Sequence, residues 1–260
     1  MSHKTARAMA FGFMAALGAL ALPFGAQAQD EASGLELIQR SGHAGTMQMP
    51  EEMASLEVDG SEGIVFEPYQ MTDELYERHD LVFLMRAGPS DWTEDDAPAA
   101  TVSDCTAQRS ISARGYGQMR ALGAMMGIIG VIPGEIVASE WCRTQDTVAA
   151  LVEGFAFIDE DQAEAIPVAT EPYVNQLDLS GDDADVAMLE QTIRDWDGNA
   201  DGPLLIVTHF ENIQALTQFN VYAGEMLVLD PVLDGRVLGY LRLISARPDR
   251  VHFDPSVVFE

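Results

Sequence analysis

The chain is poor in basic residues, and lysine is almost absent. Of its 260 residues, 14 are Lys or Arg and 42 are Asp or Glu, so the formal net charge is −28. A chain this acidic repels nucleic acid and anionic membranes, so neither is an expected partner. Lys4 is the only lysine, which excludes a phosphate-binding loop that ends in Gly-Lys-Ser/Thr. Any site for an anion must therefore be built from arginines.

Histidine and cysteine are also scarce. The five histidines and two cysteines show no metal-ligand spacing, so we expect neither a metal nor a cofactor. The chain has no Gly-x-Ser-x-Gly elbow, which argues against Ser-His-Asp chemistry. Cys105 and Cys142 are the one pair that could form a disulfide. Their spacing alone leaves open whether they do.

The first 28 residues have the pattern of a secretory signal peptide. Lys4 and Arg7 precede an apolar stretch of 17 residues, 8–24, and Ala26-Gln27-Ala28 fits a cleavage site. The apolar stretch is shorter than the roughly 20 residues of a membrane-spanning helix. We therefore expect cleavage after Ala28, a periplasmic or secreted location and no stable membrane insertion of the mature chain. Cleavage leaves 12 basic and 42 acidic residues, in a compartment that permits a disulfide.

Residues 29–70 and 71–260 differ in pattern. The first segment is weakly patterned, and we expect a poorly ordered extension with one short helix near Leu35–Arg40. The second alternates apolar runs with amphipathic stretches, which predicts one α/β domain in three layers, with a largely parallel central sheet flanked by helices. The expected strands are 81–85, 135–139, 166–169, 204–208, 226–229 and 237–243, and the expected helices are 71–79, 113–129, 144–155, 184–196 and 211–219.

Three basic side chains follow predicted strands. Arg86 ends the first strand, His209 follows the strand at 204–208, and Arg143 comes shortly after the strand at 135–139. In such sheets ligands bind beyond the carboxyl ends of the strands. The planar fork of an arginine binds phosphate oxygens through two parallel hydrogen bonds, and a histidine can add a further donor. The sequence therefore predicts that these three residues form a phosphate site.

These motifs resemble the histidine phosphatase superfamily (phosphoglycerate mutase-like), whose signature is Arg-His-Gly after the first strand. Here that tripeptide is Arg86-Ala87-Gly88. The resemblance extends over residues 80–229 and includes the segments Ser139–Arg143 and Thr208-His209. It implies a phosphomonoesterase scaffold that works through a phosphohistidine, with Arg86, Arg143 and His209 as phosphate ligands. It also implies that Ala87 occupies the position of the nucleophile.

No other histidine is expected to replace the missing nucleophile. His79 lies before the first strand, about 23 Å from Arg86 at the usual rise of a strand. His43 lies in the extension and His252 in the tail, and nothing in the sequence draws either into the site. A general acid is not assignable, because 42 acidic residues compete for the role. The candidates are Asp91, Asp104, Glu171, Glu211 and Glu225.

The sequence leaves four interpretations open. The favoured one is a phosphate-binding protein with little or no phosphatase turnover. The second is a slow phosphohydrolase in which water attacks directly. The third is an active phosphatase whose nucleophile was removed by engineering or by recent loss. The fourth is an interaction protein that uses only the fold, which would be favoured if Trp92 or Phe210 closed the pocket. Substrate identity and oligomeric state are not readable from the sequence.

Overall fold

The computed structural model describes residues 45–48, 62–67, 71–177 and 183–254. They form a mixed eight-stranded sheet with the order β1-β2-β8-β7-β3-β6-β4-β5. The neighbours β3, β6, β4 and β5 are parallel, whereas β7, β8, β2 and β1 add antiparallel ladders beside β3. The bounds are β1 Gly45–Gln48, β2 Gly63–Glu67, β3 Val82–Arg86, β4 Glu135–Ala138, β5 Val168–Thr170, β6 Leu204–Thr208, β7 Met226–Asp230 and β8 Arg236–Leu243.

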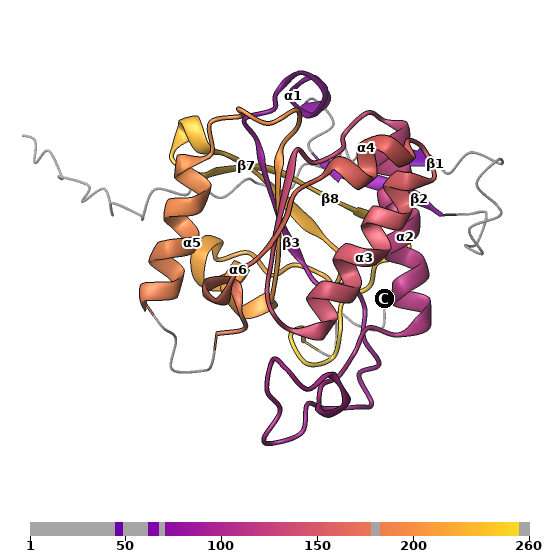
Figure 1. Ribbon diagram of the computed structural model, residues 1–260, viewed down its shortest axis with the longest axis vertical. Coiled ribbons are helices and arrows are strands. Elements are labelled where there is room, and N and C mark those ends of the chain that lie inside the picture. Colours follow the sequence, from indigo (N-terminus) through magenta and orange to yellow (C-terminus); the bar gives the residue numbers. More distant parts are fainter. Residues whose placement is uncertain (1–44, 49–61, 68–70, 178–182, 255–260) are drawn as a thin grey trace, which may run out of the picture. The chain divides into compact units, whose positions relative to one another are not determined.

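Helices cover both faces of the sheet (Figure 1). On one face α2 and α3 build the larger core cluster, and on the other α5 and α6 build the smaller one. This three-layer arrangement confirms the expected α/β class with a central parallel sheet. None of the helices in the described ranges is long and apolar enough to cross a membrane. The helices are α1 Thr72–Glu77, α2 Ala113–Ile128, α3 Cys142–Ala156, α4 Glu160–Ala165, α5 Asp183–Asp195 and α6 Phe210–Thr217.

The central strand β3 shows how the sequence fixes the layers. All five of its residues are buried, and its side chains alternate between the two faces of the sheet. Phe83 and Met85 join the cluster under α2 and α3, whereas Val82 and Leu84 join the cluster under α5 and α6. A strand buried on both faces reads as a continuous apolar run, which is why it was recognisable in the sequence.

Strand register brings the ends of three strands to one edge. Arg86 of β3 pairs with Thr208 of β6, and Ala138 of β4 pairs with Val207 of β6. Because these strands are parallel, the residues that follow them emerge together at the carboxyl edge of the sheet. Arg86, Ser139 and His209 therefore lie close together at this edge of the sheet.

The prediction of a poorly ordered extension over 29–70 is wrong for the part that the structure describes. β2 pairs antiparallel with β8, and β1 pairs with β2. Ile64 and Phe66 are buried in the larger cluster. They lie two residues apart on one face of a five-residue strand, a signal too short to stand out. The helix expected near Leu35–Arg40 and the leader lie outside the described residues.

Helices α2 and α3 approach each other closely at two glycines. A Cβ added to Gly123 would lie 2.2 Å from the carbonyl oxygen of Leu151, and one added to Gly154 would lie 2.1 Å from that of Arg120. Both obstacles are backbone atoms, which can move only if the helices separate. The close approach of these two helices therefore depends on glycine at both positions.

We predict that Gly123→Ala destabilises the fold by about 1–3 kcal/mol, the usual cost of overpacking. Gly117 of the same helix has no atom within 4 Å of an added Cβ. Gly117→Ala should therefore stabilise by up to about 1 kcal/mol through helix propensity. Urea unfolding of both variants measures the contrast. Equal effects at the two positions would contradict this account of the crossing.

Candidate functional site

The three sequence-predicted residues line one pocket at the carboxyl edge of the sheet. The pocket has a volume of about 300 Å³, and Ala87 also lines it. Arg86 is the last residue of β3, Arg143 is the second residue of α3, and His209 lies between β6 and α6. Each is only 4 % exposed. α3 and α6 also point their amino ends at this pocket, and the positive end of a helix favours an anion.

Arg86 is held by a carboxylate and by aromatic rings. Its Nη1 donates to the carbonyl oxygen of Val221 at 2.8 Å and lies 2.8 Å from Asp249 Oδ2 in an ion pair. Its guanidinium also lies 5.0 Å from the ring centre of Phe210 and 5.4 Å from that of Trp92. These contacts compensate the burial of a charge that would be costly if it were unpaired.

Arg143 has the same kind of arrangement. Its Nη1 donates to Asp96 Oδ1 at 3.1 Å and to Oδ2 at 3.3 Å, and its Nη2 donates to Gln176 Oε1. The guanidinium lies 4.5 Å from the ring centre of Trp141. Both arginines of the predicted site therefore already pair with a carboxylate of the chain.

His209 is the neutral member of the site. Its Nε2 is 2.8 Å from the hydroxyl oxygen of Ser139. Burial, and then the nearby charges of Arg143, Arg86 and Arg109, hold the pKa of the imidazole well below its usual value. His209 is therefore uncharged at neutral pH in the free protein.

The expectation that His252 stays out of the site is wrong. His252 lines the pocket, with its ring centre 4.2 Å from that of Phe210. Its Nδ1 is 2.7 Å from Asp249 Oδ1, and its Nε2 is 3.5 Å from Glu211 Oε1. The tail enters because Asp249 and His252 find opposite charges there. That attraction has no local pattern in the sequence.

These carboxylates shift the pKa of His252 upward. Burial alone would lower it, but the hydrogen bonds to Asp249 and Glu211 outweigh burial, although Arg86 opposes them. In return, burial would raise the pKa of Asp249, but His252 and Arg86 hold it well below its usual value. Asp249 is therefore ionised at neutral pH, and the two carboxylates favour the protonated form of His252.

A polar network joins the two arginines around the pocket. Glu211 Oε1 accepts a hydrogen bond from Gln176 Nε2 at 3.2 Å, and Gln176 Oε1 accepts one from Arg143. Through His252 and Asp249 the same network reaches Arg86. Carboxylates and neutral polar side chains thus link the two arginines along the wall.

The loop after β3 forms the other wall. Trp92, Asp96 and Arg109 line the pocket, and the Arg109 guanidinium lies 4.1 Å from the ring centre of Trp92. The backbone N–H of Arg109 donates to Asp96 Oδ1 at 2.7 Å. Arg109 is a third arginine of the site. It was not among the residues that the sequence predicted for the phosphate site.

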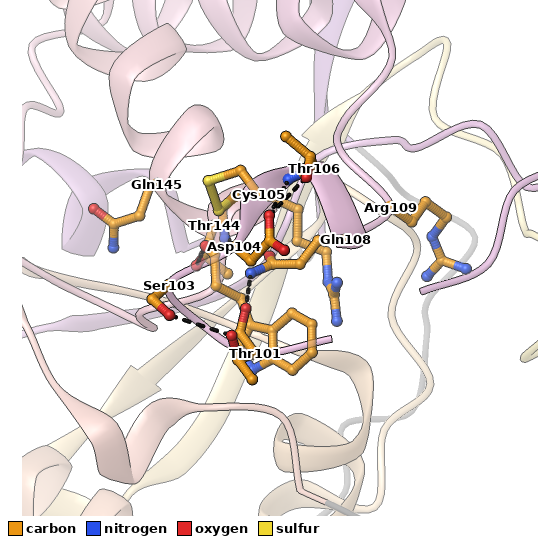
Figure 2. The surroundings of a disulfide bond; sticks show 12 residues. Thr101, Ser103, Asp104, Cys105, Thr106, Gln108, Arg109, Thr144 and Gln145 are labelled. Carbon is orange, nitrogen blue, oxygen red and sulfur yellow. Dashed lines mark hydrogen bonds between the residues drawn. A yellow bond between two sulfur atoms is a disulfide. The ribbon is translucent and has the colours of Figure 1, made fainter. Parts of the chain in front are cut away.

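A disulfide ties this loop to α3. Cys105 and Cys142 are bonded, with 5.6 Å between their Cα atoms (Figure 2). Beside the bond, the backbone N–H of Cys142 donates to Gln108 Oε1 at 2.8 Å, and Gln108 Nε2 donates to the carbonyl oxygen of Thr101 at 2.7 Å. Since Cys142 precedes Arg143, the bond holds the loop next to an arginine of the pocket.

Of the carboxylates considered as general acids, one lines the pocket. Glu211 lines the pocket, whereas Asp91, Asp104 and Glu171 are not among its lining residues. Glu225 lies beneath the edge, where its carboxylate accepts the backbone N–H of Tyr222 at 3.1 Å. No group of three or more His, Cys, Asp or Glu in the described part of the chain is arranged to hold a metal ion.

Fold and site together define an α/β protein with an arginine-rich pocket at the carboxyl edge of its sheet. Solved structures of histidine phosphatase superfamily proteins resemble this chain. The protein histidine phosphatase SixA, in complex with tungstate, is 14 % identical over 62 % of this chain and 96 % of its own, with a TM-score of 0.46. A mycobacterial glucosyl-3-phosphoglycerate phosphatase is 16 % identical over 57 % and 89 %, with a TM-score of 0.40.

The phosphoglycerate mutase from Plasmodium falciparum is a further similar structure. It is 15 % identical over 67 % of this chain and 92 % of its own, with a TM-score of 0.35. No protein-family model and no curated protein matches the chain.

We predict that His252 makes stability depend on pH. Its folded pKa is raised above an unfolded value of about 6.5. Its contribution is therefore fully present below that unfolded pKa and is lost as the pH rises through the folded pKa. The wild type should exceed His252→Gln in unfolding free energy at about pH 6, and the difference should shrink by about pH 9. Urea titrations across this range test it, and a constant difference would contradict the pairing.

Proposed function

We propose that this protein binds phosphate, or a small phosphorylated ligand, in the pocket formed by Arg86, Arg143 and His209. The observation that supports this most is their convergence from three elements on one pocket at a sheet edge. Arg109 adds a third guanidinium to the wall. Arginines suit this ligand because their planar forks match the oxygens of a phosphoryl group.

We further propose that phosphatase turnover is very slow or absent. Ala87 lines the pocket at the position where the superfamily signature has its nucleophilic histidine, and a methyl group cannot attack phosphorus. Removing the nucleophile from a catalytic unit costs on the order of 10⁶ in kcat. The proposal thus describes a member of the superfamily that keeps the binding site and lacks covalent catalysis.

An incoming phosphate has to compete with carboxylates of the chain. Asp249 pairs with Arg86 and Asp96 pairs with Arg143, so binding replaces two ion pairs instead of creating them from free charges. This competition favours a ligand with more negative charge than a single carboxylate. The net charge of −28 makes the arginine pocket a local exception to the field of the molecule.

The location of the protein is part of the proposal. The pattern of residues 1–28 supports export with cleavage after Ala28, so that the mature chain acts in the periplasm or outside the cell. A disulfide between Cys105 and Cys142 suits such an oxidising compartment. The ligand would then be a phosphorylated compound outside the cytoplasm.

One observation favours a second candidate, slow hydrolysis by direct attack of water. Burial would raise the pKa of Glu211, but His252, the backbone and Arg86 together lower it, so an ionised carboxylate lines the pocket. Such a group can orient a water molecule while arginines stabilise the charge that develops. By contrast, Trp92 and Phe210 line an open pocket, which gives no support to a purely structural role.

We predict that the protein binds phosphate and vanadate in calorimetric titrations and that Arg143→Ala weakens both. A charge-assisted hydrogen bond contributes about 1.5–3 kcal/mol, so the loss should be roughly tenfold to hundredfold. Arg194→Ala is the matched control, because Arg194 is an exposed arginine of α5 that pairs with Glu190. Absence of binding by the wild type would defeat the proposal.

We predict that Ala87→His raises hydrolysis of an aryl phosphate by several orders of magnitude, as restoring a nucleophile should. The assay compares repurified wild type, Ala87→His and Ala87→Gln, the last of which fills the space without a nucleophile. A panel of phosphomonoesters would then identify the substrate class, and would show whether an active ancestor explains Ala87. If His and Gln behave alike while phosphate still binds, the pocket has diverged beyond its nucleophile.

A further inference from the structure

The hydrogen bonds behind His209 determine which of its ring nitrogens carries the proton. They begin at Asn175, whose Oδ1 accepts the backbone N–H of Glu140 at 2.8 Å. Asn175 Nδ2 donates to the carboxylate of Glu140 at 2.7 Å. A flipped amide would place Nδ2 of Asn175 against the N–H of Glu140, and Oδ1 against the Glu140 carboxylate. Neither pair could form a hydrogen bond, so the orientation of Asn175 is fixed.

Ser139 is the next link, and its hydroxyl has one proton to give. Its Oγ lies 2.9 Å from Asn175 Oδ1, 3.1 Å from the backbone nitrogen of Trp141 and 2.8 Å from His209 Nε2. Asn175 Oδ1 can only accept, so the hydroxyl proton goes there. Trp141 N–H can only donate. The remaining lone pair of Ser139 therefore accepts a hydrogen bond from His209 Nε2–H.

This leaves Nδ1 of His209 as an acceptor. The ring is buried beside the cations of Arg143, Arg86 and Arg109, which keep it neutral, so Nδ1 holds a lone pair. His209 is the N-cap of α6, yet its side chain makes no capping hydrogen bond. Within the described residues no protein group bonds Nδ1, and the residue lines the pocket.

We propose that His209 selects oxyanions that carry a proton, because its Nδ1 accepts a hydrogen bond from the ligand. This inference rests on the proposed phosphate site and specifies its ligand: hydrogen phosphate or a singly protonated phosphomonoester, in preference to sulfate or a sulfate ester. A fully deprotonated oxyanion has only lone pairs to place against the lone pair of Nδ1. The expectation that His209 donates to the phosphate is thereby reversed.

Other charges around the pocket do not remove this preference. The arginines attract phosphate and sulfate alike, since both are tetrahedral anions of similar size. Asp96 is engaged with Arg143, and Glu211 with Gln176 and His252. Asp95 also lines the pocket, and its carboxylate acts in the same direction, because it too accepts a hydrogen bond from a ligand that carries a proton. His209 is the neutral titratable group among them, so it can distinguish ligands by their proton.

The test compares inorganic phosphate with sulfate by calorimetry at neutral pH, where phosphate keeps a proton and sulfate has none. We expect phosphate to bind about tenfold to hundredfold more tightly. His209→Ala should abolish that ratio, whereas Arg143→Ala should weaken both anions and preserve it. Equal binding of both anions by the wild type would overturn the inference and leave the proposed function standing. Binding of neither would defeat both.

A second measurement does not depend on binding. Nitrogen-15 spectra of the histidine rings in the free protein should show His209 neutral and protonated at Nε2. Ser139→Ala removes the acceptor that fixes this state and should reduce the preference for phosphate while His209 is retained. Protonation of His209 at Nδ1 in the wild type, or uptake of one proton when sulfate binds, would contradict the inference.

Discussion

The burial of two arginines at one edge of the sheet is the constraint on which the site depends. Arg86 and Arg143 are each 4 % exposed, and a buried guanidinium without a counter-charge would be strongly destabilising. Asp249 from the tail and Asp96 from the loop after β3 supply those charges. The paths of the tail and the loop over the pocket therefore follow from the need to neutralise the arginines, and the shape of the pocket follows from these paths.

The same constraint shapes the proposed anion site of this acidic protein. A chain with a net charge of −28 has carboxylates in excess, so every buried arginine acquires one. In the folded protein Arg86 and Arg143 each have a carboxylate partner, and Asp249, His252, Glu211 and Gln176 connect the two arginines along the wall. A ligand has to replace these carboxylates at the arginines. Between anions of equal charge, the match of individual donors and acceptors then decides, and in the proposed site the protonation state of His209 is part of that match.

The sequence predicts the framework of this site better than its electrostatics. Arg86 and His209 follow apolar runs that are buried on both faces, and parallel strands end at a common edge, so their proximity was derivable. His252 lies 166 positions beyond Arg86, and no local periodicity links them. Asp96 is one of 42 acidic residues, so the sequence could not identify it as the partner of Arg143. β2 was missed because its apolar face holds only Ile64 and Phe66.

The pocket contains two imidazoles, and the proposal of slow or absent turnover requires that neither acts as a nucleophile. Burial, and then the charges of Arg143, Arg86 and Arg109, lower the pKa of His209, and nucleophilicity falls with basicity. Burial would lower the pKa of His252, but Asp249 and Glu211 raise it and favour the protonated form of the ring, which has no lone pair for attack. In the proposed site, burial and the neighbouring charges therefore work against both rings as nucleophiles. The arginines proposed to bind phosphate also lower the pKa of His209, so anion binding and nucleophilic attack by this ring are opposed there.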